Sequence, residues 1–309
     1  MKKIFLCVHL MLSFFTFLQG QHLSPWQSLR GESFVVLYQQ MDSLNAQNIY
    51  KILSEDFYSI NYEIGATLEQ PVRIFIAPTE SGFTRMTGES FPHWGEAVAI
   101  PAHQQVIVKS PRWYRPSQQV KIILCHELVH VLVAAATANV ELPRWFNEGL
   151  AIYVSGDLRF VEGKELPRAV SSGHLLKLRE INSVLSFQQL QASLAYQQSF
   201  AAVQYLVDTY SHSSLPKLLQ NIATYTNFQR GFYKTYGMSV LDFEEEYRTY
   251  LDDKFRYSFL LDFETWLWVI MVGLFFLAVI IRKFKNRQKI KQWEEEHRSQ
   301  FTQYDSEEW

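Results

Sequence analysis

The feature that most constrains this chain is a pair of histidines inside a long apolar run. Residues 126–130 read His-Glu-Leu-Val-His, and the surrounding stretch from Ile122 to Ala136 contains no glycine or proline. Such a stretch predicts a helix, in which His126 and His130 lie one turn apart on the same face. Both imidazoles can therefore reach one metal ion.

The residue between the histidines completes a catalytic pattern. Glu127 lies about 100° around the helix from His126, where it can address a water on the metal without competing as a ligand. That is the position of a general base. A tetrahedral catalytic zinc also needs a third protein ligand and an open site for water. Glu148, on a separate segment, is the predicted third ligand.

A second motif surrounds Glu148. Residues 145–151 read W-F-N-E-G-L-A, and seventeen residues separate His130 from Glu148. Together the two motifs resemble the gluzincin metallopeptidases, whose third zinc ligand is a glutamate, and the arrangement is closest to the small peptidase-MA-like domains. The resemblance implies a Zn²⁺ cofactor bound by His126, His130 and Glu148, with Glu127 as the general base.

Two departures limit what the resemblance implies. Many thermolysin-like enzymes place an acid four residues after the ligand glutamate to hold a zinc histidine, but this chain has Ile152 there. The partner of that histidine must come from elsewhere. Zinc aminopeptidases carry a G-x-M-E-N box for the free amine of the substrate, and the nearest match, residues 95–99, reads G-E-A-V-A. An aminopeptidase is therefore not predicted.

Peptide hydrolysis also needs a second donor for the developing oxyanion, usually a Tyr or His from the C-terminal lobe. Tyr196 is the first choice for this catalytic role. Simple packing of Tyr196, with its hydroxyl in water, is the competing interpretation. The other candidate donors are Tyr153, His174, Tyr205 and His212.

The rest of the pattern predicts an α+β fold. Strands are expected over residues 34–38, 72–77, 97–100 and 105–109, and helices over 42–61, 79–87, from Ser117 to 136 and from Pro143 to 155. Residues 171–257 read as mainly helical, with helices over 186–190, 196–210, 215–224 and 241–255. The prediction is a thermolysin-like gluzincin domain with an N-terminal mixed sheet and helices, a zinc helix and a helical C-terminal lobe. In this family an edge strand can bind an extended substrate.

Composition excludes some classes of function. The 309 residues are 48% hydrophobic, enough for one substantial core. A formal net charge of -2 shows no basic surplus, so nucleic-acid binding is not expected. The two cysteines are Cys7 and Cys125, and because Cys7 lies in a segment expected to be removed, no disulfide framework is expected.

Both ends of the chain carry membrane signals. Residues 1–20 read as a signal peptide, with an uncleaved anchor as the alternative. Residues 263–281 are long and apolar enough for a transmembrane helix. Trp266 and Trp268 suit one interface, and six cations follow between Arg282 and Lys291. We expect a single-pass type I protein with an extracytoplasmic domain over residues 21–257 and a cytoplasmic tail over 282–309.

The predicted function is that of a membrane-anchored zinc metallopeptidase that hydrolyses peptide bonds of a peptide or protein substrate outside the cytoplasm. One alternative is a non-catalytic, membrane-tethered binding or sensor module on a gluzincin fold. Another is a zinc hydrolase of a non-protein amide or ester. The presence of Glu127 favours an enzyme, because a degenerate relative is expected to lose its base first.

Overall fold

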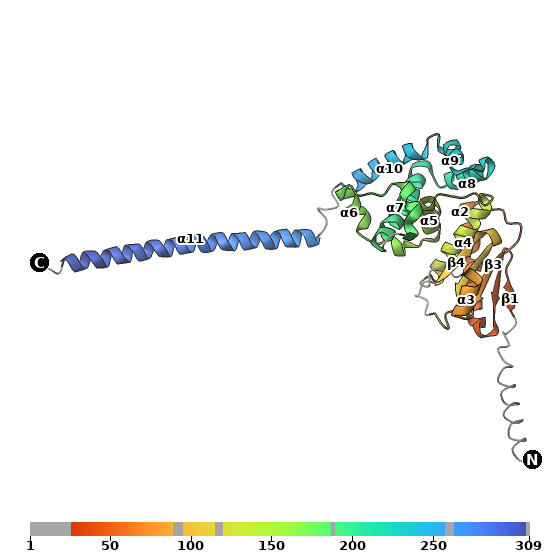
Figure 1. Cartoon of the computed structure of the whole chain (residues 1–309), viewed down its shortest axis with the longest axis horizontal. Coiled ribbons are helices and arrows are strands. Elements are labelled where there is room, and N and C mark those ends of the chain that lie inside the picture. Colours follow the sequence, from red (N-terminus) through yellow and green to blue (C-terminus); the bar gives the residue numbers. More distant parts are fainter. Residues whose placement is uncertain (1–25, 89–94, 115–119, 187–188, 257–262, 307–309) are drawn as a thin grey trace, which may run out of the picture. The chain divides into compact units, whose positions relative to one another are not determined.

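The computed structural model describes residues 26–88, 95–114, 120–186, 189–256 and 263–306 (Figure 1). It divides into two compact units. The first comprises Met1–Leu166 and Leu175–Thr249, and the second Pro167–His174 and Tyr250–Trp309. The predicted signal peptide and the predicted helix start at Ser117 lie outside the described residues.

The first unit begins with a five-stranded mixed sheet. Its strands are β1 (Gln27–Arg30), β2 (Phe34–Tyr38), β3 (Val72–Ala77), β4 (Ala97–Ile100) and β5 (Gln105–Lys109). Their order is β1-β2-β3-β5-β4, with β2, β3 and β5 parallel and the two outer strands antiparallel to their neighbours. The predicted α+β class with a mixed sheet is confirmed, and β4 is one of its two edges.

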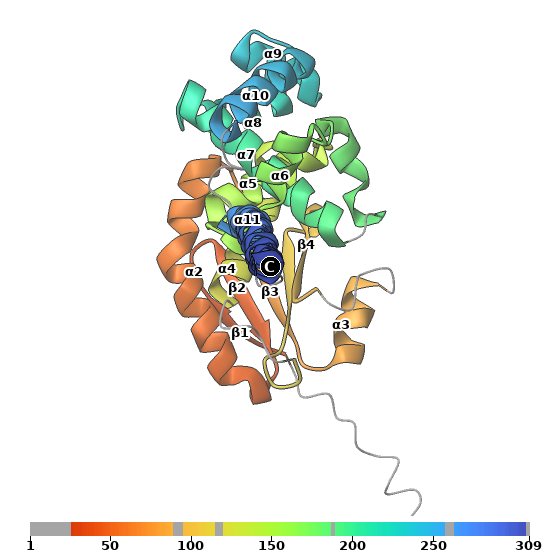
Figure 2. The same ribbon diagram turned by 90° about the vertical axis from the view of Figure 1, so that its left-hand side faces the viewer.

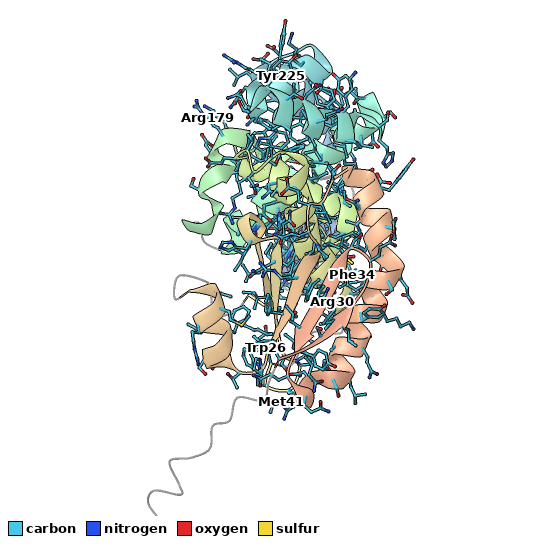
Figure 3. The ribbon with its side chains drawn as sticks, turned by 90° about the vertical axis from the view of Figure 1, so that its right-hand side faces the viewer. Trp26, Arg30, Phe34, Met41, Arg179 and Tyr225 are labelled. Atoms are coloured by element: carbon cyan, nitrogen blue, oxygen red, sulfur yellow. The ribbon has the colours of Figure 1, made fainter. Side chains whose placement is uncertain are left out.

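Helices cover both faces of this sheet. Figure 2 shows α2 (Ser43–Ile64) and α4 (Val120–Ala136) on one side of the strands and α3 (Glu80–Thr87) on the other. The inner positions are β-branched or aliphatic, as in β3, where Val72, Ile74 and Ile76 are fully buried. At the lower end of the sheet in Figure 3, the ring of Trp26 meets that of Phe75 edge-on, 5.6 Å between centroids.

Helix α4 is mostly apolar because it runs through the core. Leu124, Leu128, Val131 and Leu132 on it are fully buried. Cys125 is a free, buried cysteine whose pKa is raised to about 12, mainly by burial, so it behaves as a small core residue.

The remainder of the first unit is helical. Its elements are α5 (Arg144–Ser155), the 3-10 segments Leu158–Phe160 and Leu178–Ser186, α7 (Gln189–Tyr210), α8 (Ser214–Tyr225), α9 (Phe228–Tyr236) and the start of α10 (Val240–Phe255). A further helix, α6, spans Glu165–Ser172. In Figure 3, Tyr225 marks the helical end of this unit and Met41 the sheet end.

Several boundaries differ from those predicted. Helix α7 begins at Gln189 rather than at residue 196, and a 3-10 segment precedes it as far as Ser186. Strand β1 was not expected because its four residues are mostly exposed and do not alternate. Helix α9 was also missed, although the side chain of Asn227 caps it by accepting from the Arg230 N–H.

One glycine brings α5 and α7 into contact. A Cβ atom on Gly149 would lie 2.2 Å from the backbone oxygen of Ser199, far inside the van der Waals limit. Only glycine therefore allows this approach. Next to the contact, the Trp145 ring stacks on Phe243 at 5.8 Å between centroids, and both side chains are buried.

In the second unit, α11 (Phe263–Ser306) is one continuous helix of 44 residues (Figure 1). Within its stretch Trp266–Glu295, an 18-residue window has a mean hydropathy of 2.2, so the helix is long and apolar enough to cross a membrane. It is the one such helix among the described residues. Large apolar side chains such as Phe275 are more than half exposed along it.

The Gly149 contact predicts a large effect of a single methyl group. Gly149→Ala is expected to lower the free energy of unfolding by about 3 kcal/mol, because α5 and α7 must separate to make room. Denaturant unfolding of the purified protein measures this. Gln47→Ala, at an exposed position of α2, is the control and should change stability by less than about 0.5 kcal/mol. Equal stability of the two variants would contradict the prediction.

Candidate metal centre

Three side chains from two helices converge on one point. His126 and His130 lie one turn apart on α4, with ring centroids 5.0 Å apart. The Nε2 atoms of these rings lie 3.7 Å and 3.9 Å from Oε2 of Glu148 on α5. The potential ligand atoms of the three residues all lie within 4.8 Å of one another. The histidine pair and the downstream glutamate, distant in sequence, thus form one group able to hold a metal ion.

Groups behind the two imidazoles orient them. The Nδ1 atom of His126 is 3.3 Å from Oδ2 of Asp157, and Nδ1 of His130 is 3.2 Å from Oδ1 of Asn147. Both acceptors favour a proton on Nδ1, so each imidazole can bind a metal through Nε2 once the proton on Nε2 is released. This is the arrangement in which histidine binds a metal through Nε2.

The donor set fits zinc. Bond lengths near 2.1 Å in a tetrahedral site place neighbouring donor atoms about 3.4 Å apart. The observed separations of 3.7 Å and 3.9 Å need only a small contraction. Two imidazole nitrogens and one carboxylate oxygen are also the ligands of a catalytic site that keeps a fourth position open.

Asp157 supplies the acid that position 152 lacks. It is fully buried, directly follows α5, and accepts hydrogen bonds from Nε and Nη2 of Arg159 at 2.7 Å and 2.6 Å. Burial opposes its charge, but Arg159 and His126 outweigh burial and hold the pKa of Asp157 well below its usual range. The ionised carboxylate is thus available to His126.

The charges within the site are strongly coupled. Burial alone lowers the pKa of His126, but the carboxylates of Asp157 and Glu148 beside the ring outweigh burial and raise the pKa to about 10. Burial raises the pKa of Glu148, but the two histidines and Arg144 lower it to about 2. Glu148 is therefore a carboxylate at neutral pH, as a metal ligand must be.

Glu127 lies beside this group and is tied to the sheet. Its Oε2 atom accepts a hydrogen bond of 2.7 Å from the backbone N–H of Ala99 on the edge strand β4. The N–H of Lys109 donates to the carbonyl of Glu96, so these two residues form a hydrogen-bonded pair. Because such pairs alternate along an antiparallel ladder, the main-chain N–H and C=O groups of Ala97 and Ala99 point away from β5, to the outer side of β4. The general-base candidate is therefore attached to the open edge of the sheet.

The structure also brings Tyr196 to this region. It lies on α7, its phenol oxygen accepts a hydrogen bond from Arg144, and Glu148 and Glu127 act on it through their charges. Burial first, and then Glu148, raises its pKa to about 12, so the phenol keeps its proton. Tyr196 is thus the predicted donor that stands beside the carboxylates.

The alternative donors have other surroundings. Tyr153 and His212 pair with each other, 3.3 Å from Oη to Nε2, and His212 is exposed. The ring of Tyr205 packs against those of Phe243 and Tyr247. His174 is exposed.

A family comparison agrees with this geometry. The model of the Peptidase MA superfamily matches residues 54–253, more than half of the chain, including both histidines and Glu148. The chain belongs to the Peptidase MA superfamily. The predicted resemblance is therefore confirmed.

Among solved structures, the Peptidase MA chain is similar to native leukotriene A4 hydrolase from Saccharomyces cerevisiae, with 12% sequence identity and a TM-score of 0.40. The match covers 69% of this chain and 36% of the other, so the chain spans about a third of the length of that protein. No curated protein matches the chain.

Within this Peptidase MA domain, sequence reasoning missed three residues around the ligands. Asn147 belongs to the N-E-G-L-A motif, but its contact with His130 was not anticipated. Asp157 lies nine residues after Glu148, and its only sequence signal is the nearby Arg159, with which it forms an ion pair. Arg144 precedes Glu148 by one helical turn, a spacing that predicts contact on a helix.

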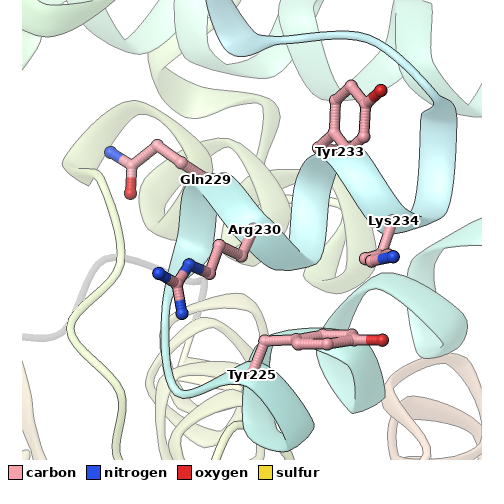
Figure 4. A pocket seen from close by; sticks show the side chains of 5 residues that line it. All are labelled: Tyr225, Gln229, Arg230, Tyr233 and Lys234. Atoms are coloured by element: carbon pink, nitrogen blue, oxygen red, sulfur yellow. The ribbon is translucent and has the colours of Figure 1, made fainter.

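A separate hollow lies on α8 and α9, with a volume of about 420 Å³ (Figure 4). It is lined by Tyr225, Gln229, Arg230, Tyr233 and Lys234. These residues offer two phenols, two cations and an amide, with no carboxylate, imidazole or thiol. The hollow therefore lacks the ligands for a second metal centre.

The contact between Asp157 and His126 predicts an effect on metal affinity. Asp157→Asn removes the charge that orients the imidazole, so the zinc dissociation constant should rise about tenfold to a hundredfold. Competition with a chromogenic chelator on the purified full-length protein measures this. Asp208→Asn, at an exposed position of α7, is the matched control. Unchanged affinity in a correctly folded Asp157→Asn protein would remove Asp157 from this role.

Proposed function

We propose that the protein is a zinc-dependent metallopeptidase that hydrolyses peptide bonds. The observation that carries the proposal is the convergence of two Nε2 atoms and Oε2 of Glu148 within 4.8 Å, with Nδ1 of His126 facing Asp157 at 3.3 Å and Nδ1 of His130 hydrogen-bonded to Asn147. His126, His130 and Glu148 would hold the ion. Membership of the Peptidase MA superfamily supports the same reaction class.

When bound, zinc supplies Lewis acidity and brings the pKa of a water toward about 7. Glu127 takes a proton from the attacking water and passes it to the leaving amine. Because Oε2 of Glu127 already accepts from Ala99, we assign the proton transfer to Oε1. Tyr196, which keeps its proton at neutral pH, donates to the developing oxyanion.

The substrate is proposed to bind as an added strand at β4. This strand is an edge of the sheet, and the N–H and carbonyl of Ala97 and the carbonyl of Ala99 face its outer side, while the Ala99 N–H donates to Glu127. A peptide in extended conformation can pair with such an edge through its backbone, independently of its side chains. The Glu127 carboxylate on the same edge then lies beside the bound backbone.

The membrane arrangement is also a proposal. Residues 1–20 act as a signal peptide, the domain over 21–257 is extracytoplasmic, and α11 anchors it with the tail 282–309 in the cytoplasm. The apolar length of α11 and the six cations between Arg282 and Lys291 support this orientation.

Glu127→Gln separates metal binding from catalysis. Because Glu127 is not one of the converging ligands, the variant should bind zinc as tightly as the wild type, while peptide hydrolysis falls by at least about a thousandfold. Metal analysis and cleavage of unstructured fluorogenic peptides, with and without a chelator, measure the two effects. Glu141→Gln, at an exposed position, is the control. Full activity of Glu127→Gln would exclude it as the base.

Glu148→Ala tests the ligand set. Losing one of three protein ligands should lower zinc content to near zero after dialysis, with loss of hydrolysis. Metal analysis of the full-length protein measures this, with Glu69→Ala, exposed, as the control. Retention of stoichiometric zinc would contradict the ligand assignment. Wild-type protein that binds zinc but cleaves no peptide would favour the binding module.

A further inference from the structure

The site contains an arginine that the proposed reaction does not use. Arg144 is the first residue of α5 and lies one turn before Glu148. Its Nε atom is 3.8 Å from Oε1 of Glu148, and its side chain is 24% exposed. Exposed ion pairs of this spacing contribute little, but the Glu148 side chain is only 16% exposed.

The two oxygens of Glu148 face different partners. Oε2 lies 3.7 Å and 3.9 Å from the histidine nitrogens, whereas the guanidinium lies on the side of Oε1. The positive charge of Arg144 attracts Oε1. The carboxylate is therefore held so that one oxygen, not two, faces the histidines.

The same guanidinium meets Tyr196, with which it shares a hydrogen bond. A guanidinium has donors only, so in this bond the phenol oxygen must accept. The hydroxyl proton of Tyr196 is then directed away from the guanidinium.

We propose that Arg144 is a positioning residue with two tasks. It presents a single oxygen of Glu148 to the metal, and it fixes Tyr196 as a hydrogen-bond donor toward the substrate. This inference rests on the proposed function, in which Glu148 is a ligand and Tyr196 the oxyanion donor. In this proposal, Arg144 contacts both Glu148 and Tyr196 and orients each of them.

The geometry favours arginine over any other cation here. A planar guanidinium can donate in two directions at once, whereas the ammonium of lysine is a compact point charge. Arg144→Lys should therefore fail to restore what Arg144→Met loses. A cation that only neutralised Glu148 would be replaced by lysine with little loss.

The experiment compares Arg144→Met, Arg144→Lys, Tyr196→Phe and the double variant Arg144→Met with Tyr196→Phe, as full-length proteins. Arg144→Met should raise the zinc dissociation constant about tenfold and lower kcat about a hundredfold. Tyr196→Phe should lower kcat similarly and leave zinc affinity unchanged. The kcat of the double variant should be no lower than the kcat of the less active single variant, because both changes remove the same donor.

Arg179→Met, at an exposed position (Figure 3), is the matched control and should change neither quantity. Arg144→Met with zinc affinity within twofold of the wild type, or with an effect on kcat that multiplies that of Tyr196→Phe, would overturn the proposal. So would a rise in KM confined to peptides with a free C-terminal carboxylate and absent for amidated ones, because Arg144 would then bind substrate.

The measurements separate the proposed function from the role of Arg144. If the wild type binds no zinc, both the proposed function and the role of Arg144 are wrong. If the wild type binds zinc without cleaving peptides, the peptidase assignment fails, and unchanged zinc affinity in Arg144→Met still decides against Arg144.

Discussion

The close approach of α5 and α7 is the constraint on which the site depends. Gly149, the residue after Glu148, allows α7 to pass with its Ser199 carbonyl where a side chain would otherwise stand. Tyr196 lies about one turn earlier on α7, so the same contact carries its phenol toward Glu148. A small residue in the motif thus sets the distance between the helix that carries Glu148 and the helix that carries Tyr196.

Buried charge around the site is compensated in a repeated way. The two carboxylates that face His126 each have an arginine partner: both oxygens of Asp157 accept from Arg159, and Oε1 of Glu148 faces Arg144. A buried carboxylate without a partner costs several kcal/mol. The arginines therefore help to keep both acids ionised.

Much of this could be predicted because local spacing carries it. The i, i+4 spacing of His126 and His130 on a helix brings their rings together in any fold, and the motif around Glu148 placed that residue on the next helix. The strand bounds of β2 to β5 also followed from alternation. What could not be predicted depends on tertiary contacts: Asp157 comes back to His126 only through the turn after α5, and the edge position of β4 is decided by the sheet order.

The register of strand β4 against β5 also affects Glu127. Its outward N–H at Ala99 holds the carboxylate of Glu127, so the strand that would align an incoming backbone also anchors the acid beside the reaction. Sliding β4 by one position along β5 would turn that N–H toward β5, because neighbouring residues alternate in direction. The register of the β4–β5 hairpin therefore decides whether the Ala99 N–H can hold the carboxylate of Glu127.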